Sequence, residues 1–334
     1  MQQLSTLEKE INIKINLKSK LYILGALIVI FSALFLTVGV NFDHIDYAMS
    51  QRIPKLIAIV ITGGGIAFSS IIFQTITNNN ILTPSVLGLD SLYVLIQTVI
   101  VFLLGVESSF ITNKSSNFLL SSSLMILASF VLYKKLFERS NNNVFFLLLV
   151  GMIFGTLFKS MSTFMQVVID PNEYAALQNS LYASFSNVNT EILMMSVIMI
   201  IAIIPFIYDE LKMLDVISLG KDHAINLGVN YDKAVKKLII VVAMLVSIST
   251  ALVGPITFLG LLVVNVAKQL FKTYKHTYLI SASILISILT LVVGQFLVER
   301  VFTFTTTISV IINFIGGLYF IYLLLKESKN QWYK

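Results

Sequence analysis

The polar residues best placed to contact another molecule lie in one charged segment, 209–237, of an otherwise apolar chain. At its centre the sequence reads Gly220-Lys-Asp-His-Ala-Ile-Asn-Leu-Gly228. Because glycine tolerates the backbone angles of sharp turns, this spacing predicts a short helix that lies flat between two glycines. Ala224 and Leu227 are expected to form an apolar edge of this helix. Lys221, Asp222 and His223 are expected to form its polar rim. The segment predicts a contact surface for a soluble protein, and an ordinary solvated loop is the alternative.

Side chains that could support catalysis or bind a metal are sparse. The chain contains no cysteine and three histidines, and His223 has no second ligand within a helical turn except Asp222 beside it. Gly63-Gly64-Gly65 lies in an apolar run with no Gly-Lys-Ser/Thr after it, so it predicts close helix packing and not a phosphate loop. Walker, His-Glu-x-x-His and paired-carboxylate motifs are missing. We expect no enzyme activity, no cofactor and no metal site.

The elements that carry these residues are membrane helices. Hydrophobic residues make up 57% of the chain and charged residues 12%, with a mean hydropathy of +0.88, which is typical of a polytopic membrane protein. A span needs about 20 mostly apolar residues. The sequence therefore predicts an all-α fold in a single domain, 1–334, with about ten transmembrane helices: 21–40, 53–74, 86–105, 117–137, 144–168, 190–208, 235–252, 256–270, 277–298 and 306–325.

The distribution of basic residues predicts the orientation. Most of the 23 lysines and arginines fall on one face if the N-terminus is cytoplasmic, as basic loops do. Both termini and 209–237 would then be cytoplasmic, and His44 and His276 would lie on opposite faces. The net charge of +6 reflects this topology and anionic lipid, with no nucleic acid as partner. The polar, lysine-rich N-terminus lacks a cleavage site, so the first span is expected to be a retained anchor. A short surface helix is expected within 170–189.

Several separated motifs together resemble one family, the iron-siderophore and cobalamin importer permeases of the type II ABC importers. Order and spacing agree from about residue 20 to residue 326. The motifs are Arg52-Ile-Pro-Lys55, Gly63–Gln74, Asn79–Gly88, Leu219–Val229, Gly254-Pro-Ile-Thr-Phe-Leu-Gly260-Leu and Ile315-Gly-Gly.

The resemblance implies the type II importer fold and the role of a permease subunit in an ATP-driven importer of the bacterial cell membrane. The implied partners are a second permease, two copies of an ABC ATPase and an extracytoplasmic siderophore-binding lipoprotein. ATP would be hydrolysed by the ATPase, and its motion would pass through the coupling helix. The residues matched to that helix are Gly220, Asp222, Ala224, Leu227 and Gly228.

The resemblance also implies two further groups of site residues. Arg52, Lys55 and Arg300 match positions that receive carboxylates of the binding protein, although snorkelling at helix ends is the plain alternative. Gate and pathway roles are implied for Asn79, Ile81 and Asn143. A pathway role is also expected for Lys159, because a charge inside a span indicates a functional site by default. For the asparagines, ordinary turn chemistry is the alternative.

Two departures from the family pattern refine the substrate and partner. Val264-Asn265-Val-Ala-Lys268 replaces Pro-His-x-x-Arg, and Leu87-Gly-Leu-Asp90-Ser replaces the commoner Gly-x-Ser-x-Gly-Ala. Both resemble permeases that pair with a non-identical permease in catecholate-siderophore importers. We therefore expect a heterodimer that imports a ferric siderophore, with cobalamin or haem as alternative substrates. An ion-coupled secondary transporter and a membrane receptor or scaffold are the alternatives from other classes.

Overall fold

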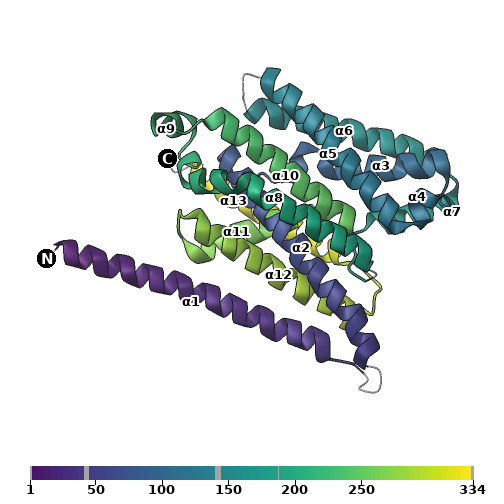
Figure 1. Cartoon of the computed structure of the whole chain (residues 1–334), viewed down its shortest axis with the longest axis horizontal. Coiled ribbons are helices and arrows are strands. Elements are labelled where there is room, and N and C mark those ends of the chain that lie inside the picture. The colour runs from purple at the N-terminus through teal and green to yellow at the C-terminus, as the bar shows by residue number, and fades with distance from the viewer. Residues whose placement is uncertain (1, 41–44, 140–143, 187, 332–334) are drawn as a thin grey trace.

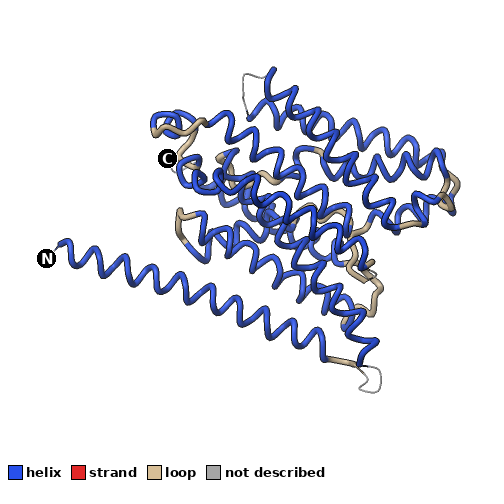
Figure 2. Tube along the Cα trace, in the orientation of Figure 1, coloured by secondary structure: helices blue, strands red, loops and turns tan. Residues whose placement is uncertain are grey.

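The fold is helical throughout the part of the chain that the computed structural model describes, residues 2–40, 45–139, 144–186 and 188–331 (Figure 2). The expected all-α architecture is confirmed. The helices are α1 Gln2–Thr37, α2 Ile45–Thr77, the 3₁₀ turn η2 Pro84–Leu87, α3 Leu89–Leu104, α4 Ser109–Thr112, α5 Lys114–Arg139, α6 Val144–Val168, α7 Pro171–Leu181, α8 Thr190–Ile217, α9 Lys221–Asn226, α10 Tyr231–Val253, α11 Leu259–Phe271, α12 His276–Arg300 and α13 Ile308–Gln331.

Each of the ten predicted spans coincides with one of these helices. Within the described residues, seven of the helices are long and apolar enough to cross a membrane, and α3 and α11 are shorter apolar helices. The remaining predicted span, 117–137, corresponds to α5, whose side chains are described only as far as residue 131. The chain is thus a multi-pass membrane protein.

The two ends of the bundle carry different connections (Figure 1). The start of α1, the end of α13 and α9 lie at one end, and α4 and α7 lie at the opposite end. We name these the inner end and the outer end, following the orientation that the basic residues predict. That both termini share one end agrees with the expected even number of spans.

Helix α2 runs through the middle of the bundle and packs against α8, α10, α11 and α12. Its glycines permit this: a Cβ on Gly63 would lie 3.1 Å from Ser287 Oγ of α12, and one on Gly65 would lie 2.6 Å from Ser249 Oγ of α10. Small residues let membrane helices approach closely. The predicted packing role of the glycine run is confirmed.

The Gly254-Pro255 break positions the short helix α11. Gly254 ends α10 with a φ of +97°, and a Cβ there would lie 2.9 Å from Ala183 Cα. Helix α11 starts at Leu259 and runs to the inner end. A broken helix is tolerated in a membrane where protein satisfies the free backbone groups, and Ser184 N donates to Val253 O at 3.0 Å beside the break.

Helix α1 is longer than the sequence indicated. Its 36 residues correspond to about 54 Å at 1.5 Å per residue, against a hydrocarbon core of about 30 Å. The apolar part is Leu17–Thr37, so the helix continues without interruption into the polar N-terminal segment. The predicted surface helix within 170–189 is confirmed as α7, which Asp170 caps by accepting from Asn172 N at 2.9 Å.

Candidate coupling and docking sites at the two membrane faces

Helix α9 is the short helix predicted between two glycines at the inner end. Gly220 precedes it with φ +94° and ψ 168°, a region that is essentially restricted to glycine. At its other end Gly228 has a φ of +84°. There Gly228 N donates to Ile225 O at 2.9 Å and Val229 N donates to Ala224 O at 3.0 Å, the paired bonds of a Schellman motif. Both glycines are therefore required by backbone conformation.

The side chains of α9 divide differently from the predicted apolar edge. Ala224 is fully buried and packs with Leu214 and Ile217 of α8. Leu227 is 63% exposed, so it lies on another face, together with two more exposed apolar residues, Leu219 and Ile225. Asp222 is exposed as well. Ala224 thus seats α9 on the bundle, and we name Leu219, Ile225 and Leu227 the inner apolar patch.

Contacts with α10 fix the direction of α9. Lys221 Nζ lies 3.0 Å from Asp232 Oδ1, and both side chains are about half exposed. Asn230 caps α10 by accepting from Lys233 N at 3.3 Å. Because an exposed ion pair contributes only about 0–1 kcal/mol, the buried Ala224 and the glycine turns do most to hold α9 in place.

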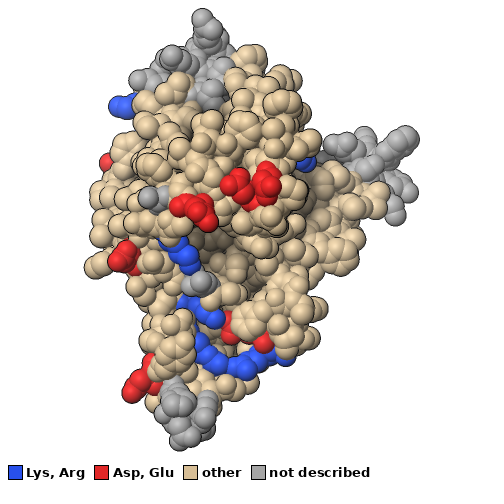
Figure 3. All heavy atoms as spheres, turned by 90° about the vertical axis from the view of Figure 1, so that its right-hand side faces the viewer, with Lys and Arg blue, Asp and Glu red and all other residues tan. Residues whose placement is uncertain are grey.

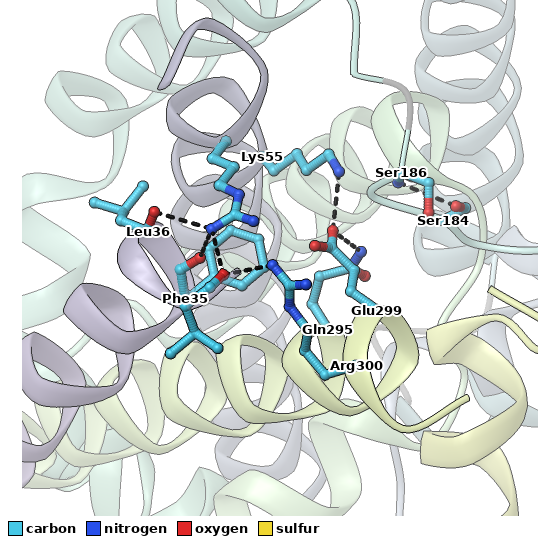
Figure 4. A network of polar contacts seen from close by, with 10 residues as sticks. Phe35, Leu36, Lys55, Ser184, Ser186, Gln295, Glu299 and Arg300 are labelled. Carbon is cyan, nitrogen blue, oxygen red and sulfur yellow. Dashed lines mark hydrogen bonds and ion pairs between the residues drawn. The ribbon is translucent and has the colours of Figure 1, made fainter. Parts of the chain in front are cut away.

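At the outer end Arg52 and Arg300 both donate to Val38 O. Lys55 follows Arg52 by one turn on α2, and Figure 4 shows Lys55 and Arg300. Arg52 Nη1 donates to the carbonyls of Phe35, Leu36 and Val38 at 2.8–3.0 Å, and Arg300 also donates to Val38 O. The last carbonyls of α1 have no partners within the helix. Both arginines therefore cap α1, and Arg300 remains exposed.

Lys55 differs from the two arginines because it is buried and paired. It is 9% exposed, and its Nζ lies 2.9 Å from Glu299 Oε1, which also accepts from Gln295 Nε2 at 3.0 Å (Figure 4). Glu299 was not among the predicted site residues. Lys55 and Glu299 are 244 positions apart in the sequence, so local pattern could not pair them. The one signal that could have indicated a role for Glu299 is its place next to Arg300.

The loop after α2 carries the predicted gate residues Asn79 and Ile81. Asn79 Oδ1 accepts from Ile81 N at 2.8 Å, a local turn. The loop is bound to α11 by Lys268, whose Nζ donates to Gln74 Oε1 at 2.8 Å and to Asn80 Oδ1 at 2.7 Å. We name residues 78–83 the inner loop.

Asn265 adds a second contact between α11 and the inner loop. Its Nδ2 donates to Asn80 O at 2.9 Å, and Gln74 Nε2 of α2 donates to the same carbonyl. Asn265 and Lys268 are two of the residues at which the sequence departs from the family pattern. The departure therefore forms a cluster that holds the inner loop against α11.

Asp90, the other departure, lies inside the bundle near the break before α11. Thr257 Oγ1 donates to Asp90 Oδ2 at 3.1 Å. A cavity of about 20 Å³ beside it is lined by hydroxyl groups of Ser70, Thr83 and Thr250. The carboxylate thus links α3 to the segment between α10 and α11.

Of the predicted pathway residues, Lys159 is exposed on α6 and Asn143 lies outside the described residues. Thr156 and Thr163 flank Lys159 on α6 and are exposed too. Ser160, four residues after Thr156, is exposed as well. Residues 3 and 4 apart share a helix face, so a polar stripe runs along a spanning helix whose other exposed residues, among the described side chains, are apolar.

A pocket of about 320 Å³ opens near the outer end, among α3, α5, α7, α8 and the end of α10. Figure 3 looks onto that end, which is hollowed between scattered acidic and basic patches. The pocket is lined by Tyr93, Gln97 and Asn117. Gln97 Nε2 donates to Asn117 Oδ1 at 2.8 Å, so these two amides satisfy each other at its wall.

Comparisons with known proteins agree with the fold and the motif positions. The chain is 60% identical over 285 residues to the petrobactin import system permease protein YclO of Bacillus subtilis, which covers 85% of this chain and 90% of that protein. It is 38% identical to the petrobactin import system permease protein FatC of Bacillus anthracis, over 84% and 79% of the two chains. A solved metal-chelate type ABC transporter in an inward-facing conformation has the same fold, with a TM-score of 0.77 and 22% identity, over 93% and 99% of the chains. The model of the FecCD transport family matches residues 20–326, and the chain therefore belongs to the FecCD transport family.

Proposed function

We propose that this chain is the permease subunit of an ATP-driven importer of a ferric siderophore of catecholate type. The 60% identity to a permease named for petrobactin import, over most of both chains, carries this proposal. Petrobactin is accordingly the first ligand to test, and cobalamin and haem are the alternatives. An external binding protein would deliver the ligand to the outer end, and the permease would pass it to the cytoplasm.

In this proposal α9 is the coupling element that receives the ATPase. The inner apolar patch supports the assignment, since exposed apolar groups beside charged ones are typical of interaction surfaces. Because Ala224 is buried against the bundle and the two glycine turns fix the backbone, α9 would move as a unit with the ends of α8 and α10. Asp222 would lie at the rim of the contact.

The second permease is proposed to be a different protein. Two petrobactin permeases of Bacillus subtilis match this chain, YclO at 60% and YclN at 26% identity. Two petrobactin permeases of Bacillus anthracis also match, FatC at 38% and FatD at 23%. In each organism the chain is closer to one permease than to the other, which supports a pair of non-identical subunits.

The polar stripe on α6 supports the pathway role of Lys159. A lysine on a lipid-facing surface in mid-span is costly, and such residues face a bundle interior or water. We therefore propose that α6 faces the ligand pathway shared with the second permease, and that Asn79 and Ile81 of the inner loop form a gate at its inner end.

The binding protein is proposed to dock beside the outer end of α1. Arg300 is exposed, while Lys55 is buried and already paired, so Lys55 would act mainly by holding Glu299. Arg52→Glu combined with Arg300→Glu should weaken docking by like-charge repulsion and alter its salt dependence. Lys18→Glu, a substitution of an exposed lysine where the apolar part of α1 begins, is the matched charge control. Equal affinity in all three proteins would contradict the docking role.

Co-expression with the neighbouring genes tests the assembly directly. Purification through a tag on this chain alone should recover an ATPase and a second, different permease in equal amount to this chain. Iron uptake from a catecholate siderophore should require both permeases. An active homodimer would overturn the heterodimer, and uptake of cobalamin in place of iron would overturn the substrate.

A further inference from the structure

We infer that His276 is a positioning residue that transmits movement of the coupling helix α9 to the inner loop. The inference rests on the proposed function, because it takes α9 as the element that the ATPase moves. It concerns a hydrogen-bonded bridge of three residues from three helices: Asp215, His276 and Thr75. None of the three was predicted as a site residue.

The bridge has short contacts on both sides of the imidazole ring. His276 Nδ1 lies 2.6 Å from Asp215 Oδ1 of α8, and the same oxygen accepts from the backbone N of His276 at 2.8 Å. On the other side Nε2 lies 2.8 Å from Thr75 Oγ1 of α2. His276 is 6% exposed. The ring therefore fills the space between α8 and α2 and contacts both through polar atoms.

The Asp215 contact has a defined direction, because a carboxylate only accepts and His276 Nδ1 therefore donates to it. On the other side Thr75 Oγ1 lies 2.8 Å from both His276 Nε2 and Ile71 O. A hydroxyl and an imidazole nitrogen can each donate or accept in such a contact. A replacement side chain with a single polar nitrogen can therefore keep only one arm of the bridge.

Each arm ends immediately next to a functional element. Asp215 lies in the last turn of α8, five residues before Gly220, where α9 begins. Thr75 lies in the last turn of α2, three residues before the inner loop starts at Asn78. Thr75 O also accepts from Asn78 N at 3.2 Å. The bridge thus forms a continuous polar route between the two elements.

The inner loop is also bound to the helix that precedes His276. Asn265 and Lys268 of α11 hold Asn80 and Gln74, and only residues 272–275 separate α11 from α12. The α11–α12 hairpin therefore holds the loop at one side and Asp215 at the other. A displacement of α8 by α9 pulls on His276, and His276 moves with the hairpin that carries the loop.

The test uses variants that keep one arm each. In His276→Asn the amide nitrogen can replace Nδ1 and keep the Asp215 arm, and in His276→Gln it can replace Nε2 and keep the Thr75 arm. Thr75→Val removes the hydroxyl, and Thr75→Ser keeps it. Thr277→Ala, at the exposed next position of α12, is the matched control. All are reconstituted in proteoliposomes with the partner permease, ATPase and binding protein.

Three quantities are measured: siderophore uptake, ATP hydrolysis, and, in the detergent-solubilised complex, labelling of an introduced cysteine at Ile81 by a water-soluble maleimide. The chain has no native cysteine, so label found on this subunit reports the inner loop. Loss of either arm should lower uptake per ATP by about tenfold, the scale of one hydrogen bond to a charged group. ATP should then no longer change the labelling rate at Ile81.

The combination of variants separates transmission from packing. His276→Asn has already lost the Thr75 arm, so adding Thr75→Val should change nothing further, whereas adding Thr75→Val to His276→Gln should lower coupling again. Thr75→Ser and Thr277→Ala should behave as the parent protein. Equal coupling in all variants would overturn the inference. So would an equal further loss of coupling when Thr75→Val is added to His276→Asn and to His276→Gln. A parent complex that fails to import the siderophore with ATP would instead overturn the proposed function.

Discussion

Replacement of the two glycines that bound α9 gives a graded test of the coupling helix. Nothing lies within 4 Å of a Cβ built on Gly220 or on Gly228, so a new side chain meets no neighbour. The whole effect of a substitution must then come from backbone conformation, φ +94° at Gly220 and +84° at Gly228. This separates the geometry of α9 from its packing.

The magnitude follows from the cost of a left-handed backbone. For an ordinary L-residue it is roughly 1–2 kcal/mol, and asparagine is tolerated better; a β-branched residue is disfavoured further. A cost of one or two kcal/mol changes a population by a factor of about 5–30. We expect coupling to decrease in the order Gly, Asn, Ala, Val at position 228. At position 220 the Asn variant should already be impaired, because φ +94° with ψ 168° is essentially accessible to glycine only.

The assay is uptake per ATP hydrolysed in the reconstituted complex, with the amount of complex measured in each sample. Asn226→Ala, which changes an exposed residue of α9 with an ordinary helical backbone, is the control for loss of a side chain. Uptake per ATP that follows the predicted order with constant amounts of complex would support the account. Equal coupling in Gly228→Val and the parent protein would refute the reasoning that the Schellman turn positions α9.

Three further predictions address the contacts that hold the bundle. Lys55→Met and Glu299→Gln should each lower the free energy of unfolding by about 3–5 kcal/mol, because each leaves a buried charge unpaired. Thermal unfolding in detergent should show that the double variant recovers stability, and additive losses would contradict the pairing. Gly260→Ala should destabilise by about 1–3 kcal/mol through collision with Ser70, and Ser70→Gly should restore stability in the same assay. Asn265→Leu with Lys268→Met should release the inner loop, so that a cysteine at Ile81 reacts faster without nucleotide; an unchanged rate would show that the loop is held by other contacts.

The sequence predicted the features that depend on local pattern. Apolar runs located the helices, and the glycine spacing located α9 with its two turns, because backbone angles near glycine follow from neighbouring residues. The glycine run of α2 indicated close packing for the same reason. Even so, the pattern assigned Ala224 and Leu227 to one edge, and the structure buries one and exposes the other.

Contacts between distant residues could not be predicted from local pattern. The docking role of Arg52 and Arg300 stays a prediction, but the sequence did not indicate that both cap α1, because that depends on where α1 ends in space. The His276 bridge joins positions 61 and 201 residues apart, and nothing in the sequence near His276 marks it. Such contacts need the packing of α2, α8 and α12 to be known first.

The measurement that most directly tests the central claim is uptake of a ferric catecholate siderophore, with petrobactin first, by proteoliposomes containing this permease and its partners. Accumulation should require ATP inside the vesicles and the binding protein outside, and a proton gradient without ATP should drive none. It should also be lost in Gly228→Val while ATP hydrolysis continues. Accumulation driven by the proton gradient alone, or ATP-driven uptake of cobalamin with none of the siderophore, would contradict the account.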